Sequence, residues 1–108
     1  MMLKKAEVKT PMLPSEEVDV PALGGKVRVQ GLLLSARLSI FDDAEVRGKG
    51  FWHIARLLSA TVVDADGDPI FSEAEWEMFG GEHLDEAMVL YAVCRRLNGM
   101  DSAGAKKN

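Results

Sequence analysis

The N-terminal half of the chain contains an alternation of apolar and polar residues that is typical of paired β-strands. Val18 and Val20 alternate with acidic residues, and Val27 and Val29 alternate with basic and polar ones. Between them, residues 21–25 read PALGG, which has the chemistry of a turn. This pattern predicts a β-hairpin with one face toward the core and one toward water.

The residues after the hairpin change to helical spacing. Within 32–41 apolar side chains recur three and four positions apart, which predicts a short amphipathic helix. Its apolar face would consist of Leu33, Leu34, Leu38 and Phe41. We expect this helix to end at the aspartate pair 42–43, and residues 45–50, which hold two glycines, to form a loop.

The middle of the chain combines a second helical stretch with a second hairpin. Residues 51–58 have helical spacing, whereas 60–63 is rich in β-branched residues and predicts a strand. An acidic turn with its tip at 66–67 separates this strand from residues 70–71, which we expect to return antiparallel to it. The sheet would then have three or four short strands.

Two helices are predicted in the C-terminal third. Ser72 and Glu75 have the spacing of a capping box, in which a hydroxyl and a carboxylate accept hydrogen bonds from amides at a helix start. That helix is expected to stop at the glycine pair 80–81. A longer helix over 82–98, ending at Gly99, would carry one apolar stripe. The stripe consists of Leu84, Ala87, Met88, Tyr91, Cys94 and Leu97.

These elements predict an α+β fold, in which a small antiparallel sheet of two β-hairpins packs on three or four helices and the long helix is C-terminal. With 108 residues, 47% of them hydrophobic, the chain has room for one core. We expect residues 1–15 to form a flexible arm, residues 16–99 a single globular domain, and residues 100–108 a flexible polar tail.

Charge and composition limit the classes of function. The formal net charge is −4, so nucleic-acid binding is not expected. No apolar run approaches the roughly 20 residues that cross a membrane, and the first residues lack the apolar segment of a secretion signal. The single cysteine excludes an intramolecular disulfide. We therefore expect a cytoplasmic protein without a membrane partner.

Charge is also unevenly distributed along the chain. The middle is mildly basic, and its cationic residues are Arg28, Arg37, Arg47, Lys49 and Arg56. Residues 64–86 are acidic. Such an asymmetry favours association between protein surfaces, which suggests a homo-oligomer or a partner segment of opposite charge.

The acidic turn has the spacing of a calcium-binding loop. The first, third, fifth and twelfth positions of that loop would be Asp64, Asp66, Asp68 and Glu75. The sixth position requires glycine but is Pro69 here, and a proline ring fixes φ near −65°. We therefore expect no metal and no cofactor, with a small calcium- or metal-binding regulatory protein as an alternative.

No motif for covalent or phosphate chemistry occurs in the chain. No serine lies within Gly-x-Ser-x-Gly, and the glycine pairs lack the spacing of phosphate-binding loops, so no catalytic residue is predicted. Cys94 lies on the apolar stripe and is expected to be buried. Large apolar residues near glycine breaks belong either to the core or to a protein interface. These interface candidates are Phe51, Trp52, Trp76, Met78 and Phe79.

Three motifs follow one another along the chain. They are VDVPALGGKVRV at 18–29, ATVVDADGDPIFS at 60–72 and RRLNG at 95–99. In this order they resemble the tail assembly chaperone family of long-tailed bacteriophages and prophages, over about residues 17–108.

The resemblance implies a non-enzymatic protein that binds the tape measure protein, keeps it soluble and helps to recruit tail tube protein during tail assembly. It also implies absence from the mature virion. The family often has a longer form made by ribosomal frameshifting, and Lys106, Lys107 and Asn108 are residues that an adenine-rich slippery sequence encodes. A frameshifted longer form of the chain is therefore another expected partner. A structural tail or head-completion subunit is the other alternative.

Overall fold

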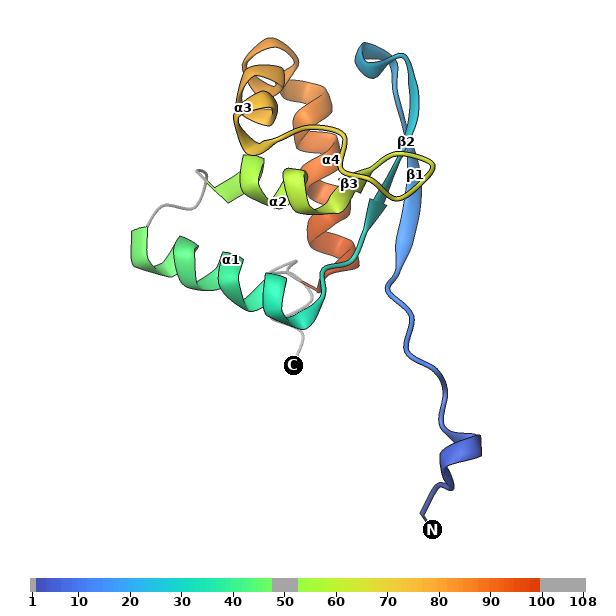
Figure 1. Cartoon of the computed structure of the whole chain (residues 1–108). Coiled ribbons are helices and arrows are strands. Elements are labelled where there is room, and N and C mark those ends of the chain that lie inside the picture. The colour runs from blue at the N-terminus through green and yellow to red at the C-terminus, as the bar shows by residue number, and fades with distance from the viewer. Residues whose placement is uncertain (1, 48–52, 100–108) are drawn as a thin grey trace.

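The computed structural model describes residues 2–47 and 53–99 of the chain. Its elements, in chain order, are η1 (Lys5–Glu7), β1 (Ser15–Val20), η2 (Pro21–Leu23), β2 (Gly25–Gln30), α1 (Leu34–Arg47), α2 (His53–Thr61), β3 (Val62–Val63), α3 (Glu73–Glu82) and α4 (Leu84–Leu97). The strands form one antiparallel sheet in the order β1-β2-β3, and the helices lie to one side of it (Figure 1). This is a small α+β fold with a long C-terminal helix, as the sequence predicts.

The β1–β2 hairpin has the arrangement that its alternating pattern predicts. Val20 lies opposite Gly25, and Gly24 between them has a φ of 91°. Residues with a side chain rarely adopt that left-handed conformation, so the turn requires glycine at this position. Val20, Val27 and Val29 are buried on the face that the helices cover.

The second hairpin is shorter than the sequence predicts. β3 is confined to Val62–Val63, and Pro69 rather than residues 70–71 forms the bridge back to Val63. The turn is closed by a hydrogen bond from the Asp64 amide to the Asp68 carbonyl, at 2.9 Å. The returning segment thus contributes a single bridge to the sheet and no strand of its own.

The end of α2 explains why the predicted strand over 60–63 is half helical. The Thr61 hydroxyl donates to the Leu57 carbonyl at 2.8 Å, inside the last turn of the helix. The same oxygen lies 2.8 Å from Cys94 Sγ on α4, in a hydrogen bond that either atom can donate. These buried contacts hold a β-branched residue in helical conformation, so tertiary structure overrides its strand propensity.

Helix α1 buries a different face from the predicted one. It continues past the aspartate pair to Arg47, and the predicted loop over 45–50 is therefore helical as far as it is described. Ile40 and the preceding Leu32 are buried, whereas Leu33, Leu34 and Leu38 are exposed. The helix packs on α2, and the side of α1 that meets α2 determines which of its side chains are buried.

The capping box at the start of α3 is confirmed. Ser72 Oγ accepts a hydrogen bond from the Glu75 amide at 3.2 Å, and Glu75 Oε1 accepts one from the Ser72 amide at 2.8 Å. The predicted stop at residues 80–81 is wrong, because α3 runs through both glycines to Glu82. His83 then separates α3 from α4.

Candidate functional site

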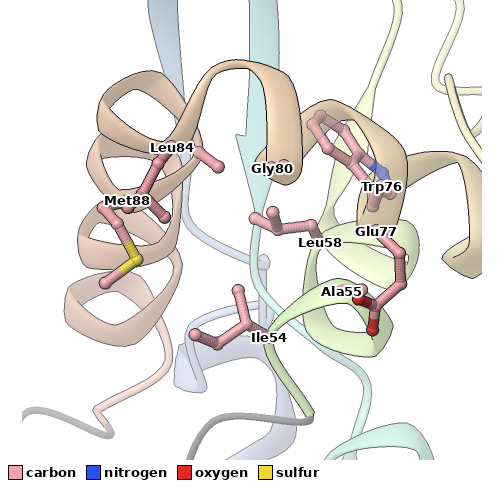
Figure 2. A pocket seen from close by; sticks show the side chains of 10 residues that line it. Ile54, Ala55, Leu58, Trp76, Glu77, Gly80, Leu84 and Met88 are labelled. Atoms are coloured by element: carbon pink, nitrogen blue, oxygen red, sulfur yellow. The ribbon is translucent and has the colours of Figure 1, made fainter.

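An open groove lies between α2, α3 and α4 and is lined mainly by apolar residues. Its volume is about 270 Å³. The lining residues come from three segments and include Ile54, Ala55, Leu58, Trp76, Glu77, Gly80, Gly81, Leu84, Ala87 and Met88. Figure 2 shows Ile54 and Leu58 from α2 facing Leu84 and Met88 from α4 across this space. We call this feature the interhelical groove.

Buried aromatic packing forms the base of the groove. The side chain of Trp76 is 1% exposed. Its ring makes edge-to-face contacts with Phe71, at 4.9 Å between centroids, and with Phe79, at 5.2 Å. The indole Nε1 is buried and has no hydrogen-bond partner among the residues that the structure describes. Trp76 therefore supports the groove as part of the core.

The upper edge of the groove is built by two glycines in the last turns of α3. A Cβ atom on Gly81 would meet no other atom within 4 Å, and one on Gly80 would lie 3.8 Å from the Ala87 Cβ. Neither glycine has a positive φ, so neither the backbone nor packing requires glycine here. Each costs up to about 1 kcal/mol of helix stability relative to alanine. Their effect is to leave this edge of the groove without side chains.

Two exposed apolar residues of α4 make the opposite edge. Leu84 is 62% exposed and Met88 is 37% exposed. The sequence predicts both on the buried stripe of the last helix, and that prediction is wrong for these two positions. The buried face of α4 consists of Ala87, Leu90, Val93 and Cys94. The helix is rotated from the predicted stripe, which leaves one edge of that stripe facing the groove.

Most residues of the groove lie in an acidic stretch of the chain. Residues 57–94 contain nine Asp and Glu and no Lys or Arg. Glu77 is the one charged side chain among the groove-lining residues named above. A ligand that placed apolar groups in the groove would therefore gain from having cationic groups at its edges.

The interface candidates predicted from the sequence separate into three groups. Phe51 and Trp52 lie outside the described residues. Trp76 and Phe79 are buried, which confirms the core interpretation for these two. Met78 is 77% exposed and lies in a second shallow depression between Phe71 and Glu82. The groove residues Ile54, Leu84 and Met88 were not among the candidates, because their spacing predicts core positions.

The acidic turn does not gather its carboxylates around a common point. Asp64 Oδ1 accepts hydrogen bonds from the amides of Asp66 and Asp68, at 2.9 and 3.0 Å, which stabilises the turn itself. The Glu75 carboxylate belongs to the capping box of α3. In residues 2–47 and 53–99, no group of three or more His, Cys, Asp or Glu side chains is placed to hold a metal ion.

Cys94 is fully buried, as its place on the apolar stripe predicts. Burial raises the pKa of its thiol to about 11, and the hydrogen bond with Thr61 opposes that shift only in part. Burial likewise raises the pKa of Tyr91, one turn earlier on α4. Because a thiolate is the reactive form of cysteine, this thiol is not activated as a nucleophile.

The raised pKa of Cys94 predicts a loss of stability at alkaline pH. The unfolded thiol ionises near pH 9, while the folded thiol keeps its proton up to about pH 11. The free energy of unfolding should therefore be unaffected by this group below pH 9 and fall by about 3 kcal/mol toward pH 11. Urea denaturation of the protein and of Cys94→Ala across this range measures the effect. An equal fall in the free energy of unfolding between pH 9 and pH 11 in the two proteins would contradict this prediction.

None of the helices in the described part of the chain combines the length and the apolar character needed to cross a membrane. Comparisons with protein-family models, with curated proteins and with solved structures find no match for this chain. The residues of the groove and the motifs of the sequence are therefore the basis on which a function can be proposed.

Proposed function

We propose that this protein is a tail assembly chaperone of a long-tailed phage or prophage, which binds the tape measure protein non-enzymatically through the interhelical groove. Two independent features support this proposal. One is the resemblance carried by the motifs at 18–29, 60–72 and 95–99. The other is the combination of an open apolar groove with an acidic surround.

The groove carries the proposal because it suits one face of an amphipathic helix. Helices bind in grooves through apolar side chains spaced three, four and seven residues apart. Leu84 and Met88 are themselves one turn apart on α4 and are exposed beside the groove, so a bound helix would cover them. Basic residues beside the apolar stripe of that helix would lie near Glu77.

A binding experiment with matched variants tests this proposal. The chain is co-expressed with helical segments of a tape measure protein, and affinity is measured by titration. Leu84→Gln with Met88→Gln should weaken binding by roughly tenfold or more, because glutamine keeps helix propensity but removes apolar surface. Leu34→Gln on α1, which removes an exposed leucine outside the groove, is the control.

The outcomes separate the proposal from its alternatives. Equal binding by the groove variants and the Leu34→Gln control would contradict a role for the groove. Finding the protein in purified particles would favour a structural tail or head-completion subunit, since an assembly chaperone leaves before the virion is finished. Saturable binding of calcium at micromolar concentration would favour the regulatory alternative at the Asp64–Glu75 loop.

The same proposal includes recruitment of tail tube protein in the host cytoplasm and a longer form made by frameshifting. Residues 106–108 lie outside the described structure, so the longer form is tested in the gene. Codons that cannot form a slippery heptamer, or a shifted frame without an open reading frame, would exclude it. Gene order provides a further check, with a tube protein expected before this gene and a very long helical protein after it.

A further inference from the structure

The segment before β1, residues 2–13, exposes five large apolar side chains. They are Met2, Leu3, Val8, Met12 and Leu13, and Met12 is 88% exposed. The segment also carries Lys4, Lys5 and Lys9 against a single acid, Glu7. We call it the N-terminal arm. Apolar side chains grouped in this way usually have a surface to cover them.

The arm leaves the body of the molecule in a fixed direction. At its base, the Gly31 amide donates to the Pro14 carbonyl at 2.8 Å. Beyond this point, the hydrogen bonds formed by arm residues within the described structure stay inside the arm. Figure 1 shows the arm running away from α3 and from the first turns of α4, where the groove lies.

The arm and the interhelical groove are complementary in charge and in apolar character. The arm has a net charge of +2 from its three lysines and one glutamate. Leu58 and the groove residues from α3 and α4 lie in the stretch 57–94, which has nine acidic residues and no Lys or Arg, whereas Ile54 and Ala55 precede Arg56. The arm contains both apolar residues and lysines, and the groove offers apolar walls beside Glu77.

We propose that the N-terminal arm of one copy lies in the interhelical groove of a second copy, and that two copies exchange their arms around a two-fold axis. A two-fold pair buries both arms and both grooves at once and leaves no open end for further growth. The arm reaches at most about 40 Å at roughly 3.3 Å per residue, which exceeds the two shorter extents of the molecule, 34 and 24 Å. It is therefore long enough to reach across a neighbouring copy.

Exchange is favoured over docking of the arm in the groove of its own chain. For that contact the chain would have to reverse direction immediately before β1. Proline fixes φ at Pro14, and the Gly31 amide holds its carbonyl. Exchange with a second copy keeps the backbone conformation at Pro14 and its hydrogen bond with Gly31 unchanged.

A charge swap in the full chain tests the proposal by sedimentation equilibrium at low ionic strength. The first variant carries Lys4→Glu, Lys5→Glu and Lys9→Glu in the arm. The second carries Glu77→Lys in the lining of the groove and Glu82→Lys at the end of α3, directly after the groove residue Gly81. We expect the unchanged protein to be dimeric, and each variant alone to dissociate with a dissociation constant raised by roughly tenfold or more. Mixed together, the two variants should form a one-to-one dimer, because each arm then meets a groove of opposite charge.

Two further measurements test whether the effect depends on the groove and whether the arm contacts it. Asp66→Lys with Asp68→Lys makes the same charge change in the acidic turn, outside the groove, and should leave the dimer intact. Met12→Cys in one chain and Leu84→Cys in another should form a disulfide between chains on oxidation, since the native Cys94 is buried. Circular dichroism establishes that each variant is folded.

Several results would overturn arm exchange. They are a monomeric unchanged protein, a dimer that survives both charge variants, and a mixture of the two variants that stays monomeric. A disulfide that forms only within a single Met12→Cys, Leu84→Cys chain would show that the arm occupies its own groove. Both proposals assign an occupant to the same groove, so the arm has to leave the groove before a helix of the tape measure protein binds there. No tape measure protein takes part in these experiments, and a failure of arm exchange therefore leaves the proposed function standing.

Discussion

Trp76→Ala is expected to lower the free energy of unfolding by about 4 kcal/mol, because it removes the largest fully buried side chain of the core. The substitution leaves a cavity between α2, α3 and α4 and removes both edge-to-face contacts, with Phe71 and with Phe79. Loss of binding by this variant would therefore reflect loss of the fold. Urea denaturation followed by circular dichroism measures the change.

Trp76→Phe is the matched control for this prediction. Phenylalanine retains an aromatic ring and eliminates the buried indole N–H, whose lack of a partner within the described residues is itself unfavourable. We expect roughly half the loss of Trp76→Ala. A Trp76→Ala protein as stable as the unchanged one would contradict the burial of this residue and return it to the interface candidates.

Asn98→Ala is expected to cost about 3 kcal/mol, because one buried side chain satisfies two backbone groups at once. Asn98 Oδ1 accepts a hydrogen bond from the Leu32 amide at 2.7 Å, and Nδ2 donates to the Cys94 carbonyl at 2.8 Å. Alanine leaves the buried amide and the last turn of α4 without these partners. The contact joins the end of the last helix to the connection between β2 and α1.

Arg96→Ala is the control for Asn98→Ala, since it lies in the same turn of α4. Its exposed guanidinium pairs with Glu16 at 2.8 Å, and an exposed ion pair of this kind contributes about 0 to 1 kcal/mol. Thermal and urea denaturation should show that the Asn98→Ala protein is much less stable than the Arg96→Ala protein. Equal losses would show that the Asn98 side chain does not stabilise the contact between α4 and the connection after β2.

Features fixed by neighbouring residues could be predicted from the sequence. The β1–β2 hairpin depends on alternation across Gly24, and the start of α3 depends on Ser72 and Glu75 three residues apart. Both are determined within a few residues, so local chemistry decides them. The α+β class follows from these elements and from the length of α4.

Features decided by packing could not be predicted. The buried face of α1 depends on how α2 lies against it, so Leu34 is exposed although its spacing predicts burial. The same holds for Leu84, which faces the groove because α4 is rotated toward Leu90 and Cys94. The groove is formed by three helices, and no single segment contains a pattern for it.

The bond between Asn98 and Leu32 also makes one backbone amide proton informative about motion. The Leu32 amide is held by a side chain 66 residues further along the chain. Exchange of this proton with deuterated solvent therefore requires the C-terminal turn of α4 to separate from the connection after β2. Its protection in a nuclear magnetic resonance experiment would report, at a single assigned resonance, how often the C-terminal end of α4 separates from the connection after β2.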